Sequence, residues 1–306
     1  MTDGLIVVDK PAGLTSHQVV GRLRRILGTR KVGHAGTLDP MATGVLLIGA
    51  GRATRLLGHL ALTDKSYRAT IRLGQATVTD DAEGDLVESR GAAGVSVEQV
   101  EAAMAAYRGR ITQVPSAVSA IKVNGVRSYA RVRAGEEVQL AGREVTVSRF
   151  ELIKAQRPAV FGWQQGGEGY AAEVLDVELE VDCSSGTYIR ALARDLGRDL
   201  GTGGHLTRLR RTRVGPFSFA EPYLSPNGLE AGPGVKVPLL SPAQVARRCF
   251  AFLELDEAEA AGVRHGQALG RPVPADPTAL LAGDELLALY RPDGARALPV
   301  AVFVAG

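Results

Sequence analysis

The chain has 306 residues, of which 45% are hydrophobic and 23% are charged, as is ordinary for a globular protein with a sizeable core. Its length exceeds that of a usual single domain, so we expect a large domain and a small one. No apolar run approaches the ~20 residues that span a bilayer, and the first residues lack the basic start of a secretory signal, so we expect a cytoplasmic protein. The two cysteines, Cys183 and Cys249, are too few and too far apart for a disulfide framework or a zinc site, and we expect two reduced thiols.

The net charge of +3 is distributed unevenly along the sequence. Residues 1–72 hold 11 Lys and Arg against 4 Asp and Glu, and residues 186–215 hold 7 against 2. A basic patch of this kind suits a polyanion, whose phosphates supply an affinity that weakens as salt rises. The other interpretation is a solvated basic face without a partner. The charge pattern alone leaves both interpretations open.

The first regular elements are a strand and an amphipathic helix. Leu5–Val8 is an apolar, β-branched run that predicts a strand. The apolar residues of 17–27 keep helical spacing, with Thr15 or Ser16 as the N-cap. Gly28 is expected to end this helix.

One imidazole and one carboxylate, His34 and Asp39, lie in the glycine-rich stretch 33–46, GHAGTLDPMATGVL. Glycines 33, 36 and 44 permit positive φ angles and close backbone approach, and Pro40 fixes φ just after the acid. We therefore expect Asp39 on a rigid corner, where it serves as a catalytic carboxylate. The alternative is an N-cap, because Asp followed by Pro also begins many helices. The short apolar run 45–49 favours the corner, since it predicts a buried strand rather than a helix.

Further elements follow from periodicity and from Gly and Pro positions. The pattern predicts helices at 53–62, 97–107, 187–200 and 266–269, strands at 67–73, 117–122, 145–153, 171–181 and 205–214, a tight turn at 124–125, a loop at 161–167 and a linker at 221–242. In the strand 205–214 apolar and basic residues alternate, which predicts one cationic face for phosphate contact.

Three side chains admit a functional and an ordinary interpretation. Lys10 precedes a Pro-Ala-Gly turn and is expected to be solvated, although it could contact RNA or an active site. By strand pattern alone, Tyr67 is a core aromatic residue with a satisfied hydroxyl. Arg190, on the first turn of its helix, could approach a carboxylate or lie on the surface.

The stretch G-H-x-G-T-L-D-P-x-A-x-G-V-L resembles the signature of the pseudouridine synthase B (TruB) family, and the match is highly specific. Other matching stretches follow the family's order over roughly the first two thirds of the chain. They are DKPAGLTS at 9–16, DKSYRA at 64–69, RLGQ at 72–75 and CSSGTYIR at 183–190. The family's T-x-T-x-D-x-x-G pattern maps onto residues 77–84, with Val78 as a departure from the polar residue of many relatives, and makes Asp81 a structural support.

The resemblance implies a role for six residues. It makes Asp39 the catalytic acid, Arg190 its ionic partner, and Tyr67 the ring that stacks on uracil and takes part in proton transfer at C5. It also implies that His34 contacts the flipped nucleotide and that Tyr188 and Leu209 line the base pocket.

The resemblance also implies the reaction and the substrate. The uridine in the T-arm loop of transfer RNA, at position fifty-five in tRNA numbering, would be flipped out and isomerised to pseudouridine. The bond between C1′ and N1 breaks, the base turns, and ribose rejoins at C5. Such an isomerisation needs a carboxylate and an aromatic surface, but no cofactor and no metal. We expect a monomer.

The expected architecture is α+β, a mixed α/β fold. A pseudouridine synthase catalytic domain at 1–240, with a largely antiparallel sheet flanked by helices, precedes a small β-rich domain at 250–306. By position, this second domain resembles the PUA-type RNA-binding domain of the family.

Two other functions are compatible with parts of the sequence. A non-catalytic RNA-binding or RNA-chaperone protein would use the same basic residues without the chemistry of Asp39. A metal-dependent hydrolase would use the acidic cluster 80–85, DDAEGD, as a cation site. This cluster lacks the full alternating-ligand loop of a calcium site, which favours a solvated turn.

Overall fold

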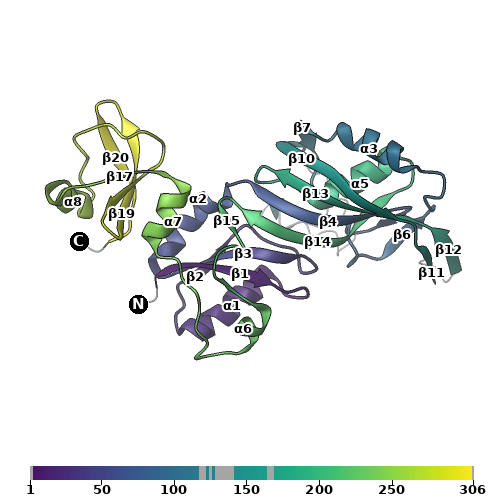
Figure 1. The fold of residues 1–306 in the computed structure, drawn as a ribbon, viewed down its shortest axis with the longest axis horizontal. Helices are drawn as coiled ribbons and strands as arrows, with labels where there is room; N and C mark the ends of the chain where they lie inside the picture. The colour runs from purple at the N-terminus through teal and green to yellow at the C-terminus, as the bar shows by residue number, and fades with distance from the viewer. Residues whose placement is uncertain (1–2, 117–121, 124–125, 128–140, 164–168, 305–306) are drawn as a thin grey trace. The chain divides into compact units, whose positions relative to one another are not determined.

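The structure, a computed structural model, describes residues 3–116, 122–123, 126–127, 141–163 and 169–304 (Figure 1). The chain divides into two compact units. Unit 1 joins residues 1–63 to residues 213–306, and unit 2 holds residues 64–212. Both units mix helices and strands, which confirms the α+β class. Within the described ranges, no helix is both long and apolar enough to cross a membrane.

The N-terminal part of unit 1 is a strand–helix–strand arrangement around β3. Its elements are β1 (Gly4–Lys10), α1 (Ser16–Leu27), β2 (Val32–Ala35), β3 (Thr43–Ala50), the 3₁₀ helix η1 (Gly51–Leu56) and α2 (Leu57–Ala61). Antiparallel pairing joins β1 to β3 from Gly4↔Ala50 to Lys10↔Gly44, and joins β2 to β3. The strand predicted at 45–49 is therefore confirmed. No helix begins at Pro40, so the N-cap interpretation of Asp39 is wrong.

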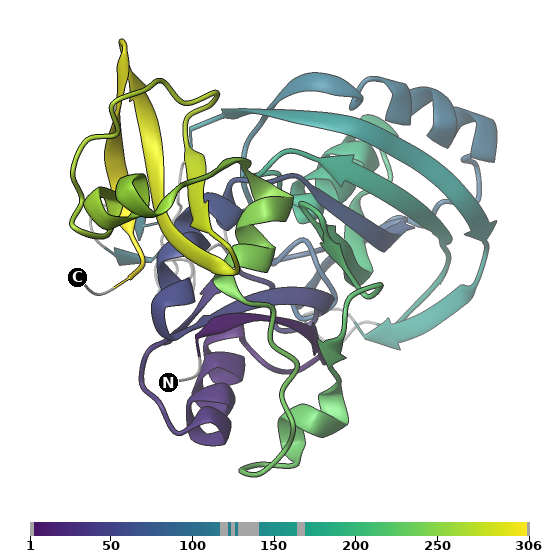
Figure 2. The same ribbon diagram turned by 60° about the vertical axis from the view of Figure 1, so that its left-hand side comes forward.

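Helix α1 has the ends that the sequence predicts. Thr15 is the N-cap and forms a capping box with Gln18, and Gly28 ends the helix with φ +63°. The helix buries Val19, Val20 and Leu23 on one face. Helix α6 (Pro226–Glu230) lies beside α1 in both views (Figures 1 and 2). The predicted helix at 53–62 is present only as η1 followed by the short α2.

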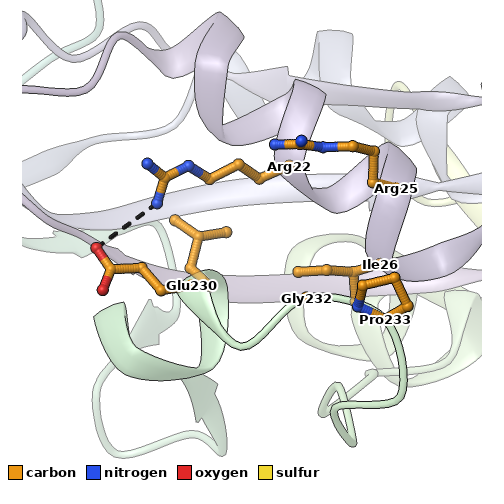
Figure 3. A pocket seen from close by; sticks show the side chains of 7 residues that line it. Arg22, Arg25, Ile26, Glu230, Gly232 and Pro233 are labelled. Atoms are coloured by element: carbon orange, nitrogen blue, oxygen red, sulfur yellow. Dashed lines mark ion pairs between the residues drawn. The ribbon is translucent and has the colours of Figure 1, made fainter.

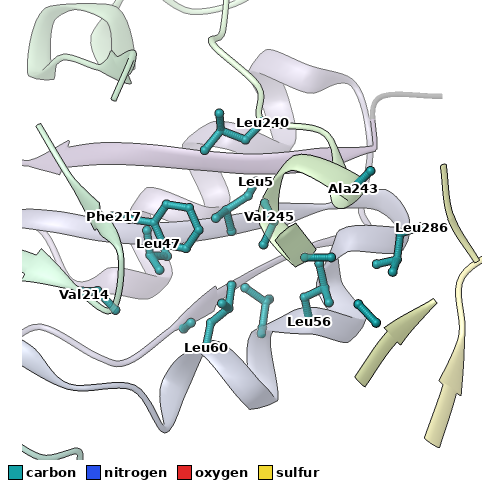
Figure 4. Packing of buried hydrophobic residues seen from close by; sticks show 14 of the residues in the cluster. Leu5, Leu47, Leu56, Leu60, Val214, Phe217, Leu240, Ala243, Val245 and Leu286 are labelled. Carbon is teal, nitrogen blue, oxygen red and sulfur yellow. The ribbon is translucent and has the colours of Figure 1, made fainter. Parts of the chain in front are cut away.

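A single apolar cluster joins the two chain segments of unit 1 (Figure 4). Leu5 and Leu47 from β1 and β3, and Leu56 and Leu60 from η1 and α2, pack with later residues of the chain. These later residues include Val214, Phe217, Leu240, Val245 and Leu286. The backbone of Leu240 also bonds that of Leu5 in both directions at 2.9 Å. The segment 221–242 is therefore packed structure in part, and its prediction as a linker is wrong there.

The end of the chain is β-rich, as predicted. Its elements are β15 (Phe217–Ser218), β16 (Tyr223–Leu224), α7 (Pro242–Cys249), β17 (Ala251–Glu254), α8 (Glu257–Arg264), β18 (Thr278–Ala282), β19 (Glu285–Asp293) and β20 (Arg296–Val302). The last four strands form one sheet in chain order. The helix predicted at 266–269 is wrong, because Asp256 caps a helix that begins earlier and the chain turns at Gly266, with φ +72°. The division at residues 240 and 250 stays a prediction.

Unit 2 is built on a sheet in the order β14-β4-β13-β10-β7. The strands are β4 (Lys65–Leu73), β7 (Gly109–Gln113), β10 (Arg143–Gln156), β13 (Leu175–Cys183) and β14 (Gly204–Val214). The pairs β4–β13, β13–β10 and β10–β7 are antiparallel. On β4, residues 67, 69, 71 and 73 are buried on one face, as their alternation predicts.

Two helices and three small ribbons complete the described part of unit 2. They are α3 (Val97–Ala105), α5 (Ile189–Asp199) and the pairs β5–β6 (Gln75–Thr77, Leu86–Ser89), β8–β9 (Lys122–Val123, Val126–Arg127) and β11–β12 (Ala159–Trp163, Gly169–Glu173). The predicted loop 161–167 is wrong for its first three residues, which belong to β11. The predicted strand 171–181 is divided at Val174, whose N–H bonds Pro158 O at 3.1 Å. Residues 117–121 and the turn 124–125 lie outside the described residues.

Candidate active site

The backbone around Asp39 is fixed by the segment that begins α1. Ser16 Oγ accepts a hydrogen bond from Leu38 N at 2.9 Å and donates one to Leu38 O at 3.2 Å. One buried hydroxyl thus satisfies both backbone groups of the residue before the acid. We call residues 38–40 the Asp39 corner and residues 10–16 its brace.

The other side of the Asp39 corner is held by Lys10. Its side chain is fully buried, and Nζ donates to Pro11 O at 2.8 Å, Leu14 O at 2.6 Å and Pro40 O at 3.1 Å. Gly13 N also donates to Pro40 O, at 2.8 Å. The prediction of a solvated Lys10 is wrong, because two carbonyl groups of the turn after β1 and the carbonyl of Pro40 surround the ammonium. Lys10 therefore cross-links the brace to the residue after the acid.

Glycine shapes the chain on both sides of the Asp39 corner. Gly36 has φ +74° and Gly44 has φ +102°, conformations that L side chains rarely adopt. Between them, Ala42 N donates to Asp39 O at 3.1 Å and closes a turn. Asp39 itself is partly exposed. Asp39 is therefore a partly exposed residue on a corner whose backbone is fixed, and the rigid corner is as predicted.

His34 belongs to the same unit as Asp39. It lies on β2 opposite Ile48 of β3, and Gly36 separates this strand from the Asp39 corner. Its ring makes an edge-to-face contact with the ring of His17, with centroids 5.1 Å apart. His17 lies in the first turn of α1, so this contact also ties β2 to the start of the helix.

The other predicted site residues lie in unit 2. Tyr67 of β4 is 8% exposed and Leu209 of β14 is 7% exposed. Tyr188 is the N-cap of α5, and Arg190 is the second residue of that helix. The structure places Asp39 and His34 in unit 1 and these four in unit 2, and the predicted roles of all six stay predictions.

Arg190 is held by the acidic turn between β5 and β6. Its Nη1 donates to Thr79 O at 3.0 Å and lies 3.5 Å from Asp81 Oδ2, with both side chains almost fully buried. Asp81 Oδ1 in turn accepts from Thr79 Oγ1 at 2.6 Å and from Glu83 N at 3.0 Å. Asp81 therefore orients the Arg190 guanidinium through a carboxylate that is itself fixed.

The neighbouring acid, Asp80, is also engaged with α5. It lies 3.5 Å from Arg194 Nη1, and burial raises the pKa of its carboxyl even though Ser116 and two arginines lower it. The described residues contain no group of three or more His, Cys, Asp or Glu side chains arranged to hold a metal ion. Asp80 and Asp81 of this turn are thus directed at arginines of α5.

Positive charge is also buried beside Tyr67. Lys65, two residues before Tyr67 on the same face of β4, is 6% exposed, and Arg211 of β14 is 1% exposed. Burial, and then the charge of Arg211, lowers the pKa of Lys65 to about 8. The cationic face predicted for 205–214 is therefore wrong in part: Arg208 is exposed, but Arg211 points into the protein.

A pocket of about 370 Å³ with two arginines lies between α1 and the segment of α6 (Figure 3). It is lined by Arg22, Arg25 and Ile26 of α1, by Leu229 and Glu230 at the end of α6, and by Gly232 and Pro233 after it. Arg22 points toward Glu230, at 3.7 Å, in an exposed pair of the kind that contributes little to stability. The pocket offers guanidinium groups to an anionic ligand.

The sequence did not indicate that two residues of the brace, Lys10 and Ser16, hold the Asp39 corner. The sequence indicates Ser16 as a helix cap and Lys10 as a solvated cation or a contact to RNA or an active site, but not the bonds that these residues make to Leu38 and Pro40. Their motif DKPAGLTS matched the family, and its spacing from the Asp39 motif was the one available signal that the two stretches fold together.

Family models match most of the chain. Residues 24–189 match "TruB family pseudouridylate synthase (N terminal domain)", residues 190–225 match "tRNA pseudouridylate synthase B C-terminal domain", and residues 250–304 match "tRNA Pseudouridine synthase II, C terminal". The first model contains Asp39 and Tyr67, and the second contains Arg190 and Leu209. These matches confirm the resemblance that the motifs carry.

Known relatives match over the whole length. The chain is 55% identical to tRNA pseudouridine synthase B of Cutibacterium acnes over 294 residues, which are 96% of this chain and 94% of that one. It is 51% identical to tRNA pseudouridine synthase B of Thermobifida fusca over 304 residues, which are 99% of each chain. Among solved structures, a chain in the crystal structure of a Cbf5-Nop10-Gar1 complex is similar, with a TM-score of 0.68 and 25% identity over 99% of this chain and 85% of that chain.

The buried lysine of the brace predicts a stability effect. Replacing Lys10 by Met keeps the apolar stem but leaves buried carbonyl groups without their donor, so Lys10→Met should lower the free energy of unfolding by roughly 1 to 3 kcal/mol. Urea unfolding measures this loss. As a control, Lys154→Met removes an exposed lysine and should change stability by less than about 0.5 kcal/mol. Equal effects of the two variants would contradict the cross-link.

The ion pair that holds Arg190 predicts a second effect. Asp81→Asn keeps the shape of the side chain but removes the charge beside a buried guanidinium. This change should lower the free energy of unfolding by roughly 3 to 5 kcal/mol. Glu88→Gln, which breaks the exposed pair with Arg90, should cost less than about 1 kcal/mol. Thermal and urea unfolding compare the two. A loss for Asp81→Asn no larger than for Glu88→Gln would show that Asp81 does not anchor Arg190.

Lys65 predicts a pH dependence of stability. Its folded pKa of about 8 lies below the ordinary value of 10.5, so between these pH values the unfolded state binds more protons and stability rises with pH. Lys65→Met removes this contribution. The free energy of unfolding of the variant should exceed that of wild type most at pH values below the folded pKa, and by progressively less above it. Urea unfolding of both proteins across that window measures the difference. A difference that does not change with pH would contradict the buried cation.

Proposed function

This chain belongs to the TruB family of pseudouridylate synthases, and from that premise we propose that it isomerises the T-arm uridine of transfer RNA at position fifty-five to pseudouridine. The C1′–N1 bond of the uridine breaks, the uracil turns within the site, and a C1′–C5 bond forms. The proton at C5 leaves and N1 gains one, so that atoms and electrons balance. Chemistry of this kind requires the uridine to be flipped out of the RNA stack.

The proposal assigns the reacting carboxylate to Asp39. The Asp39 corner supports this assignment, because Ser16 and Lys10 fix the backbone on both sides of a residue that is itself partly exposed. Attack on the ribose, addition to the base and removal of a sugar proton all need a carboxylate held in one place. The corner serves each of these routes.

Arg190 and Tyr67 complete the proposed catalytic set. A guanidinium opposite Asp39 would keep the carboxylate ionised when the RNA covers the site, because a nearby cation favours the charged form. The bonds from Arg190 to Thr79 and Asp81 support this role, since they fix its orientation before any substrate binds. Tyr67 would stack on the uracil and take part in proton transfer at C5. His34, Tyr188 and Leu209 would contact the flipped nucleotide.

RNA affinity is assigned to basic residues outside the reacting groups. The arginine-lined pocket on α1 and the exposed Arg208 support binding of a polyanion, whose strength should fall with salt. We also assign RNA binding to the domain at 250–306, which corresponds to the family's C-terminal model. In this proposal the protein works as a monomer in the cytoplasm, without a metal or a redox cofactor.

Release of label from C5-tritiated uridine in a T-arm stem-loop tests the proposal. Wild type should release tritium, and Asp39→Asn should release at least ~1,000-fold less, because the amide is neither a nucleophile nor a base. Glu101→Gln, which neutralises an exposed acid on α3, should behave like wild type. The observation that carries the proposal is the partly exposed Asp39 on its braced corner.

The outcomes separate the enzyme from a pure RNA-binding protein. Both should bind the stem-loop, and Asp39→Asn should retain binding in either case. Absence of release by wild type under conditions where it binds the stem-loop would refute the enzyme for this RNA. Normal release by Asp39→Asn would refute the role of Asp39.

A further inference from the structure

The carboxamide of Gln113 binds the peptide at which α5 begins. Gln113 is the last residue of β7 and is 3% exposed. Its Nε2 donates to Tyr188 O at 3.0 Å, and its Oε1 accepts from Tyr188 N at 2.7 Å. One side chain therefore satisfies both backbone groups of a residue 75 positions away in the sequence. A carboxamide can do this because it presents a donor and an acceptor side by side.

The helix start that Gln113 binds has no capping bond from the side chain of its own N-cap residue. Tyr188 is the N-cap of α5 and makes no side-chain capping bond, and its carbonyl accepts from Ala191 N at 3.1 Å and Leu192 N at 3.2 Å. Helix N-termini usually depend on a Ser, Thr, Asp or Asn at this position. In α5, Gln113 supplies a clamp from another strand, so the orientation of the first turn depends on that side chain.

A second bond holds the same segment to α5. Arg194 Nη2 donates to Val114 O at 2.8 Å, six residues along the helix from Tyr188. Arg194 is itself paired with Asp195 at 3.0 Å. The end of β7 thus contacts α5 at two separate points, and a shift of Gln113 would move the start of the helix rather than a single side chain.

We propose that Gln113 is a positioning residue for pseudouridine formation, acting through residues 188–190. It fixes the peptide of Tyr188, at the proposed base pocket, and through it the direction in which Arg190 leaves the helix. This inference rests on the proposed function, which assigns Tyr188 and Arg190 to the site. Misplacement of reacting groups by about 1 Å can cost ~100-fold in rate, so loss of the clamp should appear in kcat.

Gln113→Glu makes the clamp depend on pH. A protonated carboxyl has the shape of the amide, accepts from Tyr188 N and donates to Tyr188 O. The ionised form loses the donor and turns a negative oxygen toward the carbonyl of Tyr188. Burial raises the pKa of a carboxyl, so the introduced group should be protonated at mildly acidic pH and ionised in alkali. Gln113→Met removes both bonds at similar volume.

Steady-state tritium release over a range of pH and of stem-loop concentration tests the inference. Relative to wild type at each pH, kcat of Gln113→Glu should fall by ~10- to ~100-fold as pH rises, whereas KM should change less than ~3-fold because phosphate contacts dominate binding. Gln113→Met should be low at every pH. The matched control is Gln75→Glu, which alters another buried amide of unit 2 that donates to Ser89 Oγ at 3.2 Å, far from α5 in sequence, and should show no such fall.

Circular dichroism at each pH reports the folded fraction, and rates are compared per folded molecule. Wild-type kcat in both Gln113 variants at all pH would overturn the inference. A fall in Gln75→Glu equal to that in Gln113→Glu would overturn it as well, because any buried acid would then suffice. Absence of release by wild type would instead refute the proposed function, so the two failures are distinguishable.

Discussion

The backbone on either side of Asp39 is held by Ser16 and Lys10, which lie earlier in the chain. Ser16 precedes Leu38 by 22 residues, and Lys10 precedes Pro40 by 30 residues. Ser16 bonds both backbone groups of Leu38, and Lys10 and Gly13 bond the carbonyl of Pro40. A catalytic carboxylate must keep one position while RNA enters and leaves, and a corner fixed only by local turn geometry would move. Two motifs that are separate in sequence thus form one structural part.

In unit 2, the acidic turn 80–85 and helix α5 form a second interdependent part. Asp81 contacts Arg190, Asp80 contacts Arg194, and Asp195 contacts Arg194 and Arg198. Two acids of the densest acidic cluster of the chain, Asp80 and Asp81, therefore anchor arginines of α5. Gln113 of β7 binds the first peptide of α5, and the acidic turn binds arginines farther along the same helix. The start of α5, from which the Arg190 side chain projects, is therefore fixed in orientation.

Periodicity and local chemistry predicted much of the fold, because they act over a few residues. The alternation of apolar and polar residues predicted β4. The helical spacing of apolar residues predicted α1, and Gly28 predicted its end. The predictions failed where contacts between residues far apart in the sequence determine the local structure. The segment 221–242 is rich in Pro and Gly yet packs through Leu240 on β1, and Lys10 is buried only because the chain returns at Pro40. Gln113 could not be recognised, since nothing in its neighbourhood shows that Tyr188, in another part of the sequence, needs a clamp.

The central claim is the proposal that the braced carboxylate of Asp39 acts together with Arg190 and Tyr67 on one extruded uracil. The distance from the Asp39 carboxylate to the Arg190 guanidinium, measured in a crystal structure of the protein bound to a T-arm stem-loop, tests it most directly. We predict an ion pair within about 4 Å, with the ring of Tyr67 against the flipped base. Separation of the two groups by more than about 8 Å, beyond the reach of a screened ion pair, with the target uridine still stacked in the RNA, would contradict the account.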